Sequence, residues 1–307
     1  MNNSLKILLT IVTMVVSYVF FLLLEFPLDA VVGHYLARVE AQTKGAYRVS
    51  VSPDMQTSLL FNSTFNNFMV EKNVEGHFQP LFSAPKINVG FSFLSLLSGA
   101  TNVSFEAKLT KGSVSGGVSL STRKSVFDLS FKHVSLADVP ALAVYLPVAV
   151  SGQLDGDVYL SLLDDVKESE GEFKLKIFDF HTDKYTVAAA SLDIPPMTLS
   201  GSEKPAVIQG ALDAGFFKLD ELDFPGEDLV LKLKGRVQFV KGGATRSNVN
   251  GRFKVSSKVE QALPFIGFLA EQKSPEGDYP LSLTGDLKKP RLSVGTLKLS
   301  DMLNAAQ

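Results

Sequence analysis

"VFDLSFKHV", residues 126–134, alternates apolar and polar side chains with a period of two. Phe127, Leu129 and Phe131 fall on one face of an extended strand, and the polar residues between them fall on the other. This pattern is typical of a strand in an antiparallel sheet that has one apolar face and one solvated face.

The same alternation recurs along most of the chain after Tyr47. It is found in "VSFEAKLT" (103–110), "EFKLKIFDF" (172–180), "LVLKLKGRVQF" (229–239) and "YPLSLTGDL" (279–287). Glycines around these segments indicate turns or bulges. The sequence therefore predicts a mainly β protein, in which residues 46–307 form an extended, twisted antiparallel sheet with a few short helices.

One apolar residue set is predicted to share a single face of this sheet. Its members are Phe105, Phe127, Phe131, Phe173, Leu231, Phe239 and Leu281. Such a face has to be removed from water. The sheet can close into a sandwich or barrel, curl into a trough, or keep the face as a groove for an apolar ligand, and the pattern does not separate these outcomes.

Two apolar, Ala/Leu-rich segments interrupt the strand pattern. They are "SLADVPALAVYLP" (135–147) and "SSKVEQALPFIGFLAEQ" (256–272). We predict a short helix in each. Because each follows a strand and precedes another, the order strand, short helix, strand forms a weak internal repeat. A third segment, "FSFLSLLSG" (91–99), is predicted to bridge two strands.

The N-terminal region has the features of a membrane anchor. Residues 7–24 carry no charge, and as a helix they span about 27 Å, close to the ~30 Å hydrocarbon layer. Lys6 precedes this segment and no Ala-x-Ala cleavage pattern follows it. We predict a cytoplasmic N-terminus (1–6) and an uncleaved transmembrane helix (7–26), in preference to a signal peptide or a buried core helix.

Residues 27–45 are predicted to form an amphipathic helix. Its apolar positions have helical spacing and include Leu28, Val31, Val32, Tyr35 and Leu36. This stripe can cap the sheet or lie on the membrane surface. We favour the cap.

Composition and motifs give no indication of catalysis. The chain of 307 residues has no cysteine and a net charge of −2, so disulfides are excluded and nucleic acid is not an expected partner. The four histidines lack metal-ligand spacing. The acidic residues of 155–157 and 164–170 can act as acids and bases or bind calcium, but we interpret them as solvated turns. We therefore predict no catalytic residue, no cofactor and no metal. A hydrolase with dispersed acidic residues is the least favoured hypothesis.

Several segments together resemble a known family. They are the anchor followed by "FPLDAVVGHYLARVEAQTKGAYRVSV", then "FSFLSLLSGATNVSFEAKLTKGSVSGGVSL", "VSLADVPALAVYLPVAVSGQLDGDVYLSL" and the C-terminal "EGDYPLSLTGDLKKPRL". These stretches resemble the type II secretion system protein N family in its long form, and the wider AsmA-like group of envelope proteins.

The resemblance implies a single-pass inner-membrane protein whose bulk lies in the bacterial periplasm. It implies a non-enzymatic accessory or structural component of the type II secretion system, with other secretion-machinery proteins as partners. Its AsmA-like side implies an alternative, in which an apolar β groove handles phospholipid or other outer-membrane components. The shared motifs are structural, so the resemblance assigns no catalytic residue.

Overall fold

The computed structural model describes residues 40–41, 43–52, 56–58, 62–91, 101–187, 192–240, 244–286 and 289–299. The predicted membrane anchor and all five named residues of the amphipathic helix lie outside these ranges, as does most of the 91–99 bridge. They remain predictions. Among the described helices, none combines the length and apolar character needed to cross a membrane.

Antiparallel strands make up most of the described chain, which confirms the predicted mainly β fold. The first strands are β1 (Tyr47–Ser50), β2 (Gln56–Ser58), β3 (Asn62–Val74), β4 (His77–Phe91), β5 (Thr101–Lys108), β6 (Ser113–Leu120), β7 (Lys124–Ser135), β8 (Val150–Leu163) and β9 (Glu170–Thr182). The remaining strands are β10 (Tyr185–Val187), β11 (Leu192–Ile194), β12 (Met197–Thr198), β13 (Ala206–Asp213), β14 (Phe216–Pro225), β15 (Leu229–Val240), β16 (Ala244–Val255), β17 (Tyr279–Asp286), β18 (Lys289–Val294) and β19 (Leu297–Lys298).

The strands pair largely in chain order within one sheet. Strand β3 pairs with β1 and β2 on one side, and β4 to β9 then follow one another. Strand β9 pairs with β12 and β13, and the order continues from β14 to β19. Strands β10 and β11 form a separate hairpin. Among the described strands no pairing joins the two ends, so the sheet is open.

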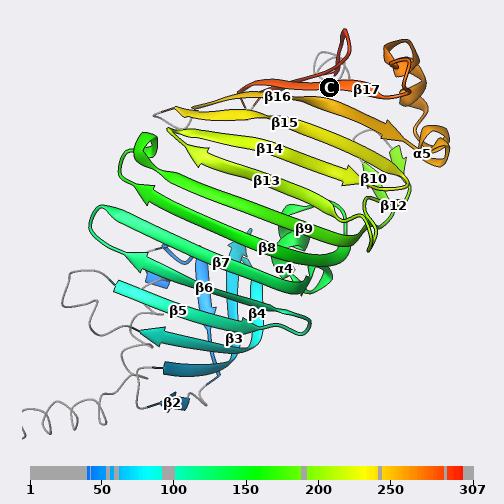
Figure 1. Cartoon of the computed structure of the whole chain (residues 1–307). Coiled ribbons are helices and arrows are strands. Elements are labelled where there is room, and N and C mark those ends of the chain that lie inside the picture. Colours follow the sequence, from blue (N-terminus) through cyan, green and yellow to red (C-terminus); the bar gives the residue numbers. More distant parts are fainter. Residues whose placement is uncertain are drawn as a thin grey trace, which may run out of the picture.

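Short helices occupy the two segments that interrupt the strand pattern, as predicted. The first contains η1 (Leu136–Asp138) and α4 (Pro140–Tyr145), and the second contains α5 (Ser257–Ala262) and η4 (Pro264–Gln272). A further turn, η2 (Val166–Glu168), lies between β8 and β9. Figure 1 shows α4 and α5 toward the same end of the long strands.

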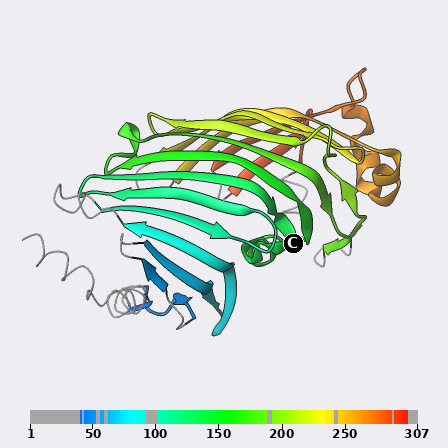
Figure 2. The ribbon, with the colours of Figure 1, turned by 60° about the horizontal axis from the view of Figure 1, so that its bottom comes forward.

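The sheet curls toward the face that carries α4. This helix lies between β7 and β8 in the chain, yet it contacts β4, three strands from β7. The Lys72 ammonium of β3 also donates a hydrogen bond of 3.2 Å to the Tyr145 hydroxyl at the end of α4. Such contacts require the β3–β4 end to bend around toward α4, and Figure 2 shows the resulting arch. We call the face inside the arch the concave face.

Buried apolar residues form three separate clusters rather than one core. The first, at the β3–β5 end, contains Phe65, Ala84, Ile87 and Ala107. The second lies under η1 and α4 and contains Leu136, Ile177 and Ala206. The third lies under α5 and η4 and contains Val259, Leu263, Ile266, Leu269, Tyr279 and Val294. The helices thus bury only parts of the concave face.

Mid-strand glycines permit the close strand contacts of this curved sheet. Gly156, in the middle of β8, has a φ of 142°, which L-residues rarely adopt. A side-chain carbon at this position would collide with the carbonyl oxygen of Lys174 on β9. Because the same kind of collision with a neighbouring strand would occur at Gly210 and Gly251, glycine is required where the sheet bends.

We expect Gly156→Ala to destabilise the protein by about 3 kcal/mol, because it combines a strained φ with a backbone collision. Urea or thermal unfolding of the full chain measures this change. Gly201→Ala is the matched control, since a side-chain carbon at Gly201 has no neighbour within 4 Å. Equal stability of the two variants would contradict the role of Gly156 in the bend.

Candidate functional site: an open apolar trough

Strand register aligns apolar residues in rows that run across the concave face. One row lies at the end of the strands nearest α4 and α5, and we call it the walled-rim row. It contains Val134, Leu154, Ile177, Ala206, Phe224, Leu231, Phe253 and Tyr279. At the opposite strand ends, Leu120 and Leu162 lie on either side of Ser125. We call this pair the open-rim row.

Three central rows connect the two rims across β6–β9 and β13–β15. The row nearest the open rim contains Val118, Phe127, Leu160, Gly171, Leu212, Phe217 and Val237. The next contains Gly116, Leu129, Val158, Phe173, Gly210, Leu219 and Gly235. The third contains Val114, Phe131, Gly156, Leu175, Ile208, Leu222 and Leu233. None of these side chains is polar.

The residues predicted from the sequence spread over this face. Phe127, Phe131 and Phe173 lie in the central rows, and Leu231 lies in the walled-rim row. Phe105, Leu281 and Phe239 extend the set toward the two ends. Phe105 packs against the cluster at the β3–β5 end and Leu281 against the cluster under α5. The backbone of Phe239 pairs with Thr245, and its side chain is outside the described part of the chain.

Most of the large side chains in the central rows are only half-buried. No second layer of sheet or helix covers Phe127, Phe131 or Phe173 in the described chain, and each keeps intermediate exposure. By strand spacing of about 4.8 Å, the seven strands of these rows extend for roughly 29 Å. An apolar area of this size is unusual on the surface of a soluble monomer and marks an interaction site.

Glycines let the large side chains lie flat on the floor of the trough. Phe173 of β9 faces Gly210 of β13, and a side-chain carbon at Gly210 would meet the Phe173 ring. The ring reaches across this gap to Phe217 of β14, with ring centroids 5.0 Å apart and planes 5° apart. An aromatic ring thus fills the space over Gly210, and leucine side chains lie over Gly116 and Gly171.

Helix α4 covers the walled rim but is weakly anchored. Leu142 packs on the cluster that contains Ile177 and Ala206. The helix has no side-chain N-cap and none of its own residues is buried. Its last residue, Tyr145, is 58% exposed. The Lys72 ammonium lies over the Tyr145 ring, 4.8 Å from the ring centroid, in a cation–π contact. Contacts of this exposed kind contribute about 0.5–1 kcal/mol each.

Helix α5 is anchored much more firmly to the same rim. Its N-cap Ser256 accepts a hydrogen bond from the Val259 N–H and donates one to Asp228, at 3.4 and 3.0 Å. Asp228 also accepts from the Thr198 N–H at 2.9 Å, which ties α5 to β12. At the other end, Glu260 accepts from the Lys273 ammonium at 2.8 Å. These contacts hold α5 and η4 over the buried Tyr279.

Two carboxylates in this anchor have lowered pKa values. Partial burial by itself would raise the pKa of Asp228, but hydrogen bonds from Thr198 and Ser256, with the nearby Lys258 ammonium, outweigh it and lower the pKa. The hydrogen bond from Lys273 is the main cause of the lowered pKa of Glu260. Both groups therefore stabilise the fold in their ionised form.

The convex face carries the polar residues and has open hollows, including one of about 880 Å³ over β13 to β16. Asp155 and Asp157 of β8 lie opposite Lys176 and Lys174 of β9, and Asp155 also accepts a hydrogen bond from the His133 N–H. Asp155 and Asp157 therefore lie within a strand on the charged convex surface, and their interpretation as a turn was wrong. No group of three potential metal ligands occurs within the described residues.

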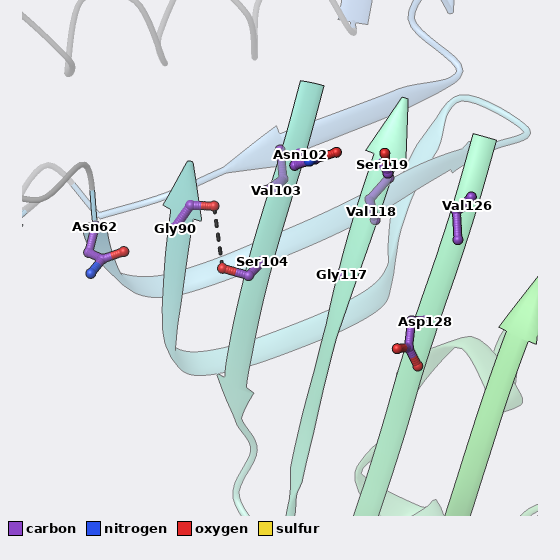
Figure 3. Close-up of a pocket in the computed structure, with 10 residues that line it drawn as sticks. All are labelled: Asn62, Gly90, Asn102, Val103, Ser104, Gly117, Val118, Ser119, Val126 and Asp128. Atoms are coloured by element: carbon purple, nitrogen blue, oxygen red, sulfur yellow. Dashed lines mark hydrogen bonds between the residues drawn. The ribbon is translucent and has the colours of Figure 1, made fainter. Parts of the chain in front are cut away.

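Figure 3 shows one convex hollow, of about 460 Å³, across β3 to β7. It forms where side chains are small, at Gly90, Ser104 and Gly117, and it includes the exposed carboxylate of Asp128. The Ser104 hydroxyl bonds the Gly90 carbonyl at 3.5 Å. Since the hollow contains no buried polar group that lacks a partner, nothing in it indicates a ligand.

Sequence reasoning missed several residues of the trough. Leu160, Val158 and Phe217 lie on the same floor as the predicted residues, and the alternation around them was a sufficient signal to find them. No sequence signal distinguishes the exposed rim residues Leu120 and Leu162 from the covered residues of the other rim. That difference arises only from the positions of α4 and α5.

Comparison of the chain with protein-family models, curated proteins and solved structures found no match. The function of the trough therefore has to be argued from its own residues.

Asp228→Asn should lower stability near neutral pH by about 1 kcal/mol, because the variant loses charge-assisted hydrogen bonds. The ordinary pKa values of Asp228 and Glu260 are 3.8 and 4.5, and both are lowered in the folded state. The two carboxylates therefore contribute fully to folding stability at pH values above their ordinary pKa values. This contribution is lost as the pH falls through the ordinary pKa and then the lowered pKa of the folded state. Unfolding measured from pH 7 to pH 3 should show a smaller acid loss in the variant than in the wild type.

Asp213→Asn is the control for this measurement. Asp213 forms an exposed ion pair with Lys218 at 2.9 Å, and such pairs contribute little to stability. An Asp228→Asn variant with the same stability and the same acid loss as the wild type would show that the carboxylate does not anchor α5.

Proposed function

We propose that this protein binds the acyl chains of lipids along its concave face and serves lipid handling in the cell envelope. The observation that supports the proposal is the floor of the trough. Three adjacent rows of apolar side chains cross seven strands, remain half-exposed, and contain no polar side chain.

A hydrocarbon ligand fits this surface better than a protein partner. Protein interfaces contain about one hydrogen bond per 100–200 Å² of buried area. The central rows offer no side-chain donor or acceptor, and the backbone groups of β6–β9 are used in the sheet ladder. Acyl chains require only apolar contact, which stabilises the bound state by about 0.8 kcal/mol for each buried methylene.

The cellular setting of the proposal comes from the sequence. The predicted anchor and the AsmA-like resemblance support a location of the trough in the periplasm of a bacterium, at the inner membrane. In this setting an extended apolar surface is suited to carrying phospholipid or another outer-membrane component through water. Because the rows run across the strands, the ligand can move from strand to strand without leaving apolar surface.

A component of the type II secretion system is the second proposed function. It rests on the resemblance to the protein N family, and one structural feature favours it. At one edge of the described sheet β1 and β2 pair only with β3, and at the other edge β19 covers only the Ser293–Val294 end of β18. Such edges can pair with a strand of another protein.

We expect Phe131→Glu to abolish lipid binding. The change places a charge in the third central row, where an acyl chain would have to desolvate it. Native mass spectrometry and lipid extraction of the full chain purified from membranes in mild detergent measure the bound lipid. Lys132→Glu, on the exposed adjacent position, should retain it.

Because Phe131 is half-buried, Phe131→Glu can also destabilise the fold, so unfolding of both variants is measured in parallel. A folded Phe131→Glu variant with wild-type lipid content would contradict acyl-chain binding on this face. A wild-type protein that is stable and carries no lipid would contradict the proposed function itself.

If the secretion function is correct, deletion of the gene should trap exoproteins in the periplasm. The measurement is the fraction of secreted enzyme activity that remains in the periplasmic extract. Complementation with the wild-type gene should restore export. Normal export by the deletion strain would leave lipid handling as the better proposal.

A further inference from the structure

The two rims of the trough differ sharply in exposure. Along β8, Leu162 of the open-rim row is 37% exposed, and Leu120 beside it is 44% exposed. At the other rim, Val134, Ile177 and Tyr279 are between 1% and 7% exposed. The apolar side chains of the open-rim row are therefore exposed, whereas those of the walled-rim row are buried or half-buried.

A continuous set of elements builds the covered rim. Leu136 of η1 and Leu142 of α4 pack on Ile177 and Ala206. Further along the trough, Ile194 of β11 and Met197 of β12 join the cluster under α5 and η4. Among the residues that the structure describes, the opposite rim contains the β6–β7, β8–β9 and β13–β14 connections, and of these three only the β8–β9 connection contains a helical turn, η2. Figure 1 shows α4, β10, β12 and α5 toward the same side of the sheet.

We propose that a bound lipid lies across the trough in one orientation, with its acyl ends toward the walled rim and its headgroup at the open rim. This inference rests on the proposed function. It adds that the headgroup lies at the open rim, that the acyl ends point to the walled rim, and that the protein recognises the hydrocarbon part of the lipid.

The chemistry of the two rims supports this orientation. The clusters under α4 and α5 are apolar, so a charged headgroup there would lose its hydration without gaining partners. At the open rim the turns are exposed to water and carry charges of both signs, with Arg123 and Lys124 in one turn and Asp164 and Asp165 in the next. A headgroup of either charge can remain hydrated there.

The distance from the open rim to the third central row agrees with the thickness of one leaflet of lipid. The open-rim residue Leu162 and the third central row at Gly156 are six residues apart on β8. At about 3.4 Å per residue this distance is roughly 20 Å. Half of a bilayer, headgroup included, is about 20–22 Å thick. A lipid whose acyl chains end at the third central row therefore brings its headgroup to the open rim, and the walled-rim row at Leu154 lies two residues, or about 7 Å, further on.

Mixed charge at the open rim leaves recognition to the hydrocarbon part of the lipid. Asp213 and Lys218 of the β13–β14 hairpin already neutralise each other at 2.9 Å, and the cations Arg123 and Lys124 after Leu120 are offset by the carboxylates Asp164 and Asp165 after Leu162 in the next turn. Lipids with the same acyl chains and with either a zwitterionic or an anionic headgroup should therefore bind equally well.

The orientation can be measured by fluorescence quenching, because the chain contains no tryptophan. Three full-length single-tryptophan variants are compared, each loaded with labelled phosphatidylcholine. They are Leu162→Trp at the open rim, Phe224→Trp at the walled rim, and Tyr159→Trp on the convex side of β8 as the control. The quencher is a nitroxide on the headgroup, or bromine near the terminal methyl of the acyl chain.

We expect the headgroup nitroxide to quench Leu162→Trp more strongly than Phe224→Trp, and the terminal bromine to give the reverse order. Tyr159→Trp should lose no fluorescence with either probe. Phe253→Trp, in the same row under α5, replaces Phe224→Trp if that variant does not fold.

Equal quenching of the two rim variants by each probe, or the opposite order, would overturn the orientation while leaving acyl-chain binding intact. An absence of quenching at both rims would overturn acyl-chain binding and the orientation with it. A strong preference for one headgroup at equal chain length would contradict recognition through the hydrocarbon alone.

Discussion

The cross-strand register of one antiparallel sheet is the constraint on which the rest of this structure depends. Each strand places its apolar side chains on the same face as its neighbours, and this phase is preserved through bulges. On β7, Phe131 and Val134 both face inward although they are three residues apart, because the register shifts between them. His133 has a positive φ of 51° within this bulge, and the Asp155 carboxylate accepts a hydrogen bond from the His133 N–H. Without the shift, His133 would occupy the walled-rim row and Val134 would face water.

Alternation predicted the strands and most of the apolar face, and its failures have identifiable physical causes. A strict period of two continued from Phe131 would place His133 on the concave face. The sequence does not reveal the bulge that prevents this, because a bulge depends on pairing with the neighbouring strand. The mid-strand glycines were interpreted as turns or bulges. Gly210 does lie at a register shift, whereas Gly156 lies in continuous register with β9, where the carbonyl of Lys174 approaches its backbone. The two short helices were predictable because proline and Ala/Leu-rich composition interrupt the strand period.

Whether the apolar face is covered is a tertiary property, and local pattern contains no information about it. A strand in a two-layer sandwich and a strand in a single curled layer have the same alternation of side chains. The difference lies in how much helix the chain supplies and where it packs. Here α4 and α5–η4 cover only the strand ends on one side, so Ile177 is buried while Phe173, four residues earlier on the same strand, is half-exposed. Because the helices cover only these strand ends, the predicted residues Phe127, Phe131 and Phe173 form a half-exposed surface rather than a buried core.

An uncovered floor also determines where the stability of the protein resides. Buried side chains concentrate in the cluster at the β3–β5 end and in the two clusters under the helices. The central strands between them depend on backbone pairing and on flat contacts such as Phe173 with Phe217. These strands therefore gain the most from any ligand that removes their side chains from water, because binding to the folded state alone stabilises it. The feature that makes the trough a candidate binding surface is thus the same feature that leaves its centre without a cluster of buried side chains.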